Sequence, residues 1–179
     1  MEQKVSPAKA ALSYGLVFGI IMFIELVIAY SLKLDAQSNP TIGVLMNLLN
    51  FLILPVLFIA LACNHYKKNM NGGYISFGQS IKCGVSVTVL AGALFAILNA
   101  LFYAILPEAK EQVLEQMKTA MAQQPNMTAE MLKQSMTGIE FFMKPYISIP
   151  FTIIIYAFTG LILSLIVGAI VKKDNPGAF

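Results

Sequence analysis

Six polar residues lie where their side chains could bind a proton, a cation or a small ligand within an otherwise apolar chain. One falls in each of four hydrophobic stretches, and these four are Glu25, Asn50, Asn99 and Tyr156. A rise of about 1.5 Å per residue, counted from the outer ends of the stretches, places all four roughly 12–15 Å deep. Asn47 and Tyr103 lie one turn further out, so we expect this polar layer to open outward.

Glu25 is the acidic member of this layer, and a carboxylate at that depth is costly unless it is paired. The chain offers no Lys or Arg at that level. We therefore expect Glu25 to be protonated or to share hydrogen bonds with the Asn and Tyr side chains. Two interpretations stay open. The layer is either a site for a proton, a cation or a small ligand, or a hydrogen-bonded cluster that fixes helix register.

Most other kinds of chemical site lack their residues in this chain. The 179 residues include one His, two Cys and no Arg, because all 12 basic residues are Lys. This composition disfavours metal centres, Cys/His or Ser/His/Asp catalysis, and phosphate binding by Arg. We therefore expect a protein that is not an enzyme, with no cofactor, no metal site and no nucleic-acid partner.

The stretches that hold the polar residues are long and apolar enough to cross a lipid bilayer. The chain is 58% hydrophobic and 12% charged, with a mean hydropathy of +0.73, whereas soluble domains are about 25% charged. About 20 apolar residues cross the hydrocarbon core as a helix. The sequence predicts an all-α polytopic membrane protein, one membrane domain over residues 1–179, with four transmembrane helices at about 11–32, 42–63, 83–106 and 146–171.

The distribution of lysines predicts the orientation of these helices. Seven lysines belong to the two chain ends and to the loop between the second and third helices: Lys4, Lys9, Lys67, Lys68, Lys82, Lys172 and Lys173. By the positive-inside rule, the side that carries them is cytoplasmic. We expect a multi-pass protein of the cell inner membrane whose N- and C-termini are both cytoplasmic.

Residues 107–144 are expected to form an extracytoplasmic insertion of amphipathic helices. Pro107 is typical of a helix start, and Thr128 can cap a second helix. Six of the ten methionines lie between Met117 and Met143. Copper(I) binding by thioethers is one interpretation, and a surface for helix packing, lipid contact or a protein partner is the favoured one.

Small residues recur every four positions on three of the spans, a pattern that lets helices pack closely in a membrane. The longest series is on the third span: Gly84, Thr88, Gly92, Ala96, Ala100 and Ala104. We expect this helix at the centre of the bundle. Close packing within the chain, or contact with a second copy or a protein partner, is predicted at the shorter series Gly15/Gly19 and Gly160/Ser164/Gly168.

Three short motifs carry a family resemblance. Ser13-Tyr14-Gly15 opens the first span, Gly72-Gly73-Tyr74-Ile75-Ser76-Phe77-Gly78-Gln79 precedes the third, and Pro107-Glu108 begins the outer segment. With these motifs the chain resembles an uncharacterised domain-of-unknown-function family of small four-helix inner-membrane proteins typical of Bacteroidetes. The resemblance covers most of the chain. It implies a fold and a membrane location without an activity, so it assigns no catalytic residue.

Two functions from different classes follow from these features. The sequence favours a non-enzymatic accessory or interaction protein, which contacts a partner or the membrane surface through its outer helices. The alternative is a small transporter, or a protein that binds a proton, a cation or another ligand at the polar layer around Glu25.

Overall fold

The structure, a computed structural model, describes residues 6–34 and 39–175. Lys4, one of the lysines used to predict orientation, lies outside the described residues. Within the described ranges, four helices are long and apolar enough to cross a membrane, and all regular secondary structure is helical. The predicted all-α fold with four spans is confirmed. The length and hydropathy of these helices indicate a multi-pass membrane protein.

Each span begins before the predicted apolar stretch, because its first turn is stabilised locally. Three spans begin with Pro, whose missing amide costs no hydrogen bond there. The first, third and fourth spans are the single helices α1 (Pro7–Ser31), α4 (Phe77–Ile105) and α7 (Pro145–Val171). The second span consists of α2 (Pro40–Leu48), a π-helical segment (Leu49–Ile53), α3 (Leu54–His65) and a second π-helical segment (Tyr66–Met70).

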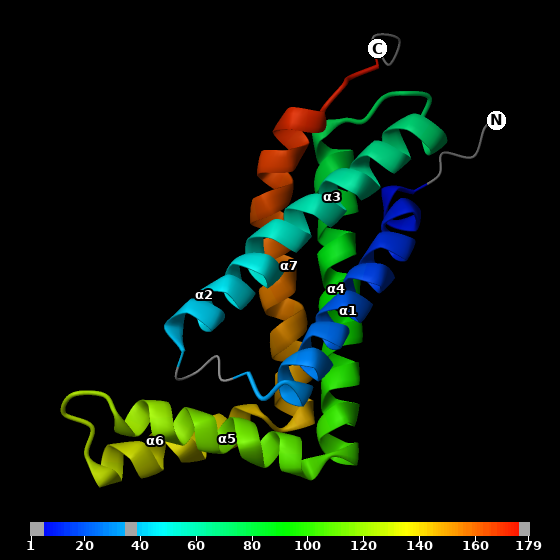
Figure 1. The fold of residues 1–179 in the computed structure, drawn as a ribbon. Helices are drawn as coiled ribbons and strands as arrows, with labels where there is room; N and C mark the ends of the chain where they lie inside the picture. Colours follow the sequence, from blue (N-terminus) through cyan, green and yellow to red (C-terminus); the bar gives the residue numbers. More distant parts are fainter. Residues whose placement is uncertain (1–5, 35–38, 176–179) are drawn as a thin grey trace.

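Helix α4 is the centre of the bundle and packs along both α1 and α7 (Figure 1). Its small-residue series makes these contacts, since Gly84 lies against Ser164 and Thr88 against Gly160. On the other side, a Cβ at Gly15 would lie only 2.7 Å from the Cβ of Leu90. The series on α1 and α7 thus pack against α4 within the chain.

The first part of the second span, α2, leaves the bundle. Figure 1 shows α2 diverging from α4 and α7, and none of its residues is buried, whereas α3 contributes Phe58 and Ile59 to the core. The change of direction coincides with the segment Leu49–Ile53. There the amide of Leu54 donates to the carbonyl of Leu49, five residues back, and Pro55 has no amide hydrogen to continue the ordinary α-helical pattern.

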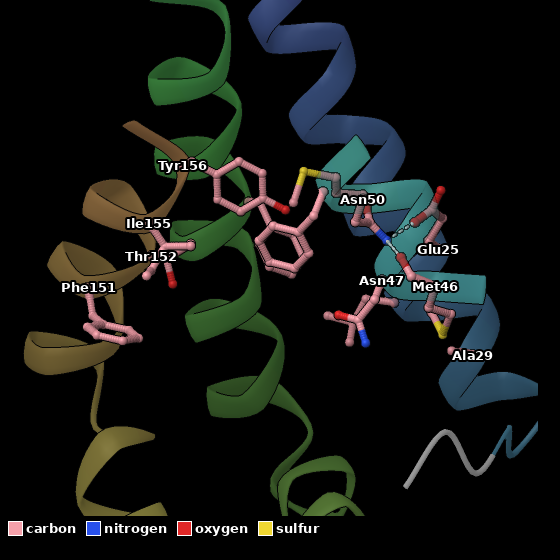
Figure 2. Close-up of a pocket in the computed structure, with 13 residues that line it drawn as sticks. Glu25, Ala29, Met46, Asn47, Asn50, Phe151, Thr152, Ile155 and Tyr156 are labelled. Atoms are coloured by element: carbon pink, nitrogen blue, oxygen red, sulfur yellow. Dashed lines mark hydrogen bonds between the residues drawn. The ribbon is translucent and has the colours of Figure 1, made fainter. Parts of the chain in front are cut away.

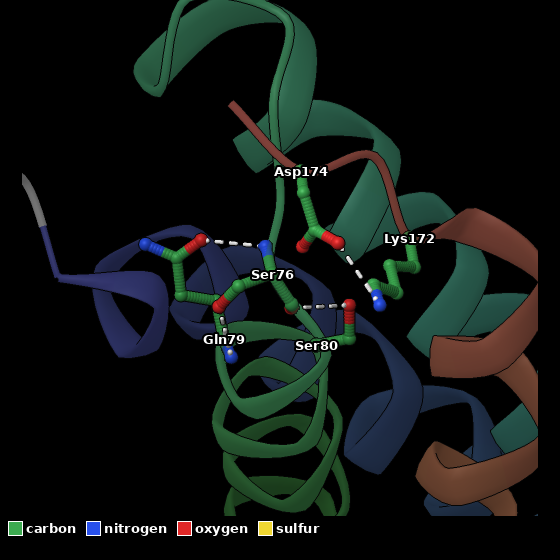
Figure 3. A network of polar contacts seen from close by, with 5 residues as sticks. All are labelled: Ser76, Gln79, Ser80, Lys172 and Asp174. Atoms are coloured by element: carbon green, nitrogen blue, oxygen red, sulfur yellow. Dashed lines mark hydrogen bonds and ion pairs between the residues drawn. The ribbon is translucent and has the colours of Figure 1, made fainter. Parts of the chain in front are cut away.

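The lysine-rich end of the bundle is held together by polar contacts. In Figure 3, Ser76 and Gln79 form a capping box at the start of α4, with distances of 2.8 and 3.3 Å between amide nitrogens and side-chain oxygens. The backbones of Ile75 and Lys173 pair with each other. Lys67 Nζ donates to the carbonyl of Val171 at 2.8 Å. The loop between the second and third spans is therefore tied to the end of the fourth.

Two amphipathic helices lie at the opposite end of the bundle, α5 (Pro107–Ala122) and α6 (Ala129–Phe142). Figure 1 shows them running across this end of the bundle, at a steep angle to α4. As predicted, Pro107 is the first residue of α5, and Thr128 Oγ1 accepts a hydrogen bond from the amide of Met131. We call α5, α6 and their connection the hairpin.

Candidate functional site

A cavity of about 350 Å³ opens between α1, the first half of the second span and α7 (Figure 2). We call it the Glu25 cavity. Four of the six predicted site residues line it: Glu25 from α1, Asn47 from α2, Asn50 from the π-helical segment and Tyr156 from α7. Its volume lies within the range of about 300–1,000 Å³ that small-molecule sites occupy.

Glu25 and Asn50 are joined directly at one wall of this cavity (Figure 2). Asn50 Nδ2 donates to Glu25 Oε2 at 2.8 Å and also to the carbonyl of Met46 at 3.1 Å. The other amide atom, Asn50 Oδ1, is buried and has no hydrogen-bond partner. Because that oxygen has almost no accessible surface, the acceptor that the pair offers to a ligand is the Glu25 carboxylate, which Asn50 holds in place.

Aromatic rings form much of the remaining wall, and sequence reasoning identified only one of them. The buried ring of Tyr156 stacks on Phe51 with centroids 5.5 Å apart and an interplanar angle of 23°. Phe95 and Phe151 also line the cavity. Phe51 belongs to the π-helical segment and follows Asn50 directly, so one turn supplies both a polar and an aromatic group. Hydrophobic periodicity in the sequence could not indicate that Phe51 lines the cavity beside Asn50. Pro55 was the one local signal that the helix is irregular at this point.

The position of Tyr156 depends on the close approach of α4 and α7. A Cβ at Gly92 would lie 2.7 Å from the Cβ of Tyr156. Because Gly92 has no side chain, the α7 backbone comes near enough to bring the Tyr156 ring over the cavity. The small-residue series of α4 therefore positions part of the candidate site as well as the core.

Asn47 lies at the edge of the cavity. Its Nδ2 donates to the carbonyl of Gly43 at 2.9 Å, one turn back on α2, and its side chain is exposed. Thr152 of α7 lies on the opposite wall (Figure 2). The polar groups of the cavity therefore come from α1, the second span and α7, and the edge residues lie toward the hairpin end of the bundle.

Asn99 and Tyr103 do not reach the Glu25 cavity. Both line a second cavity of about 760 Å³ between α4, the hairpin and the start of α7, which also includes Lys110. We call it the Lys110 cavity. Asn99 Oδ1 is itself buried and has no hydrogen-bond partner. The structure thus divides the six predicted residues between two cavities, because Asn99 and Tyr103 occupy the face of α4 turned toward the hairpin.

Neither cavity contains an arrangement typical of a metal centre. Within residues 6–34 and 39–175, no three His, Cys, Asp or Glu side chains are grouped so that they could hold a metal ion. The Glu25 cavity offers one carboxylate, an amide and aromatic faces. This set can hold a small ligand by charge, hydrogen bonds and ring contacts.

The comparison with known families was made over the whole chain. A family model described as a protein of unknown function (DUF4199) matches residues 13–173. The chain belongs to the DUF4199 family. No curated protein and no solved structure matches it. The resemblance to a domain-of-unknown-function family is confirmed.

The region matched to DUF4199 contains every residue that lines the two cavities. The family description names no activity, so a function for this DUF4199 protein has to be argued from the cavities themselves. Of the two, the Glu25 cavity is the one that holds a carboxylate, fixed by a hydrogen bond, among aromatic rings.

Proposed function

We propose that this membrane protein binds a small organic amine, in its protonated form, in the Glu25 cavity. The observation that carries the proposal is the Glu25–Asn50 pair, in which a hydrogen bond holds a carboxylate in place at the wall of an aromatic cavity. A protonated amine supplies both the opposite charge and N–H donors for the carboxylate oxygens of Glu25. The protein acts on this ligand by binding or by transport, without changing it chemically.

The charge balance of the cavity supports a cationic ligand. None of the described residues that line it is a Lys, and Glu25 is its one charged side chain. A carboxylate in such surroundings is stabilised most by a cationic ligand, since the few water molecules that reach it cannot fully solvate its charge. An anionic ligand would meet repulsion from Glu25 with no cation to offset it.

The walls of the cavity support an apolar body on the ligand. The rings of Phe51 and Tyr156 stack on each other at the cavity wall, and Phe95 and Phe151 add two more faces. Aromatic faces attract cations and also cover apolar groups. A ligand with an ammonium group and an aromatic or branched body matches both halves of the site.

Two matched probes test the proposal, 2-phenylethylamine and its uncharged analogue 2-phenylethanol. They are titrated into the purified full chain in lipid nanodiscs, and binding is followed by saturation-transfer NMR. We expect the amine to bind at least about tenfold more tightly than the alcohol, a difference of about 1.4 kcal/mol. The variant Glu25→Gln keeps the side-chain shape and should abolish this preference.

Glu115→Gln is the control, because it removes an exposed carboxylate of the hairpin that lines neither cavity. It should bind the amine as the wild type does. Equal binding of the amine and the alcohol by the wild type would refute a cationic ligand. In proteoliposomes, amine flux that depends on Glu25 would identify a transporter, and binding without flux would identify a receptor-like role.

We also propose that the protein lies in the inner membrane of a bacterium with both chain ends in the cytoplasm. The support is the gathering of Lys67, Lys68, Lys172 and Lys173 at one end of the bundle, away from the hairpin. A cysteine introduced at Gln123, in the hairpin, should react with a membrane-impermeant reagent added outside. Labelling only from the cytoplasm would reverse this orientation.

A second candidate function is an accessory role in which the hairpin contacts a protein partner. It is favoured by apolar side chains that α6 leaves exposed, among them Met131, Phe141 and Phe142. Met131→Ser and Phe141→Ser should then release a stoichiometric partner that co-purifies from native membranes, whereas Glu25→Gln should retain it. A partner that remains bound to the hairpin variants would argue against this role.

A further inference from the structure

The Lys110 cavity is lined by four helices, and each of them contributes a polar side chain with a donor group. Lys110 comes from the first turn of α5, and three hydroxyl groups come from the other helices: Tyr103 of α4, Ser135 of α6 and Ser148 of α7. Among the described residues, none lines both this cavity and the Glu25 cavity. The two cavities are therefore separate places for a ligand.

These four polar groups are free to bind a ligand. Within the described part of the chain, no hydrogen bond or ion pair involves Lys110 Nζ or the hydroxyls of Tyr103, Ser135 and Ser148. All four residues are half-buried, and their polar atoms keep accessible surface, whereas Asn99 Oδ1 has almost none. The cavity thus offers one ammonium and three hydroxyl donors that the fold itself does not use.

The charge of the cavity is a single positive one. Lys110 is the one charged residue among its described lining residues. The five acidic residues of the hairpin are all exposed and line neither cavity: Glu108, Glu111, Glu115, Glu130 and Glu140. One ammonium offsets one negative charge, and a second negative charge would stay uncompensated in these surroundings. The cavity therefore favours a ligand with one negative charge.

Most of the remaining lining is apolar and comes from the same four helices. Ala100 of α4, Met117 of α5, Ile139 of α6 and Pro145 of α7 all belong to it. The volume of about 760 Å³ lies within the range of about 300–1,000 Å³ that small-molecule sites occupy. A ligand that suits this cavity carries an apolar body beside its acidic group.

We propose that the Lys110 cavity binds an organic monoanion, which consists of one acidic group on an apolar body. The acidic group pairs with Lys110 and accepts hydrogen bonds from the three hydroxyls, and the apolar body lies against α5 and α6. A water-soluble carboxylate and the headgroup of an acidic membrane lipid share this chemistry. The site does not depend on amine binding in the Glu25 cavity.

Two probes of similar shape test the proposal, 3-phenylpropanoate and the uncharged 3-phenylpropan-1-ol. They are titrated into the full chain in nanodiscs of zwitterionic phosphatidylcholine, and binding is followed by saturation-transfer NMR. We expect the carboxylate to bind about five- to tenfold more tightly than the alcohol. Lys110→Gln should remove this preference. The matched control Lys118→Gln, at an exposed lysine of the same helix outside the cavity, should keep it.

A second variant tests the hydroxyls without changing the charge. Ser135→Ala/Ser148→Ala removes two donors and leaves Lys110 in place, and alanine suits both helices at least as well as serine does. The double variant should weaken carboxylate binding about threefold or more without lowering the thermal stability of the protein. Unchanged carboxylate binding would overturn the assignment of these hydroxyls to the site.

The source of the monoanion is identified with phosphatidylglycerol, whose headgroup carries one negative charge. Native mass spectrometry of the full chain in a neutral detergent counts the phosphatidylglycerol retained by the wild type, Lys110→Gln and Lys118→Gln. Retention that falls only in Lys110→Gln would identify a lipid headgroup as the ligand. Equal retention by all three, together with carboxylate binding that depends on Lys110, would identify a water-soluble carboxylate.

Two results would overturn the proposal as a whole. One is equal binding of the two probes by the wild type or an unchanged preference in Lys110→Gln. The other is an equal loss of preference in Lys118→Gln, which would show only a general attraction to the lysines of the hairpin. Binding of 2-phenylethylamine should be the same in Lys110→Gln as in the wild type, so the failure of one site leaves the other standing.

Discussion

Asn50 Nδ2 donates to Glu25 Oε2 at 2.8 Å and so joins the first span to the irregular turn of the second. The contact lies beside the point where α2 turns away from the bundle. It fixes the carboxylate at one wall of the cavity while the opposite wall belongs to α7. The geometry of the site therefore depends on both Glu25 and Asn50. We expect the stability of the fold to depend on both residues as well.

The first prediction concerns the energetic coupling of this pair. Asn50→Leu leaves Glu25 without its donor and should lower the free energy of unfolding by about 1–3 kcal/mol. The double variant Glu25→Leu/Asn50→Leu removes both polar groups and should recover part of that loss. Equilibrium unfolding in mixed micelles measures Asn50→Leu, Glu25→Leu and the double variant. Strictly additive effects would show that the two side chains do not stabilise each other.

A second prediction concerns the packing of α4 against α7. Gly92→Ala places a methyl group against Tyr156 and should lower the free energy of unfolding by about 1–3 kcal/mol. The matched control is Gly138→Ala, whose new methyl group meets open space and should raise it by roughly 0.5–1 kcal/mol. A neutral result for Gly92→Ala would mean that the two helices can separate at little cost.

Tyr156 allows its ring and its hydroxyl to be tested separately. Tyr156→Phe keeps the stack on Phe51 and should change the free energy of unfolding by less than about 1 kcal/mol. Tyr156→Ala removes the ring and should cost about 3–5 kcal/mol. Thermal unfolding distinguishes the two variants. If Tyr156→Phe is as destabilising as Tyr156→Ala, the hydroxyl rather than the ring stabilises this wall.

The fourth prediction concerns the turn in the second span. Pro55→Ala supplies an amide that can donate to the carbonyl of Phe51, so the helix should become regular and α2 should change direction. Spin labels at Val44 and Ile154, both exposed, report the separation of α2 from α7 after the native cysteines are replaced by alanine. We expect a shift in this separation for Pro55→Ala and none for Pro40→Ala, at the first position of α2.

The sequence was sufficient to predict the four spans and the central helix. Charge-free apolar stretches of this length have few other stable conformations, since a bilayer requires every backbone group to be bonded internally. The central place of α4 followed from its small-residue series, because close helix approach needs side chains such as those of Gly84 and Gly92. The cap at Thr128 could also be predicted, since it depends only on neighbouring residues.

The division of the polar residues between two cavities could not be predicted. Depth along a helix can be counted from sequence, but the direction in which Asn99 points depends on how α4 crosses its neighbours and on where the hairpin lies. The aromatic residues Phe95 and Phe151 carry no signal that separates a cavity wall from a lipid-facing position. The assignment of Lys110 to a cavity likewise required the tertiary arrangement of α5.

The π-helical segment Leu49–Ile53 also changes how substitutions in the second span should be read. Each hydrogen bond there spans one residue more than in an α-helix, so the segment acts as a one-residue insertion. Residues before and after it are out of phase by about 100°. A single helical wheel drawn through this span would therefore mix lipid-facing and inward-facing positions. Its two halves have to be compared between relatives as two separate registers, joined at Asn50 and Phe51.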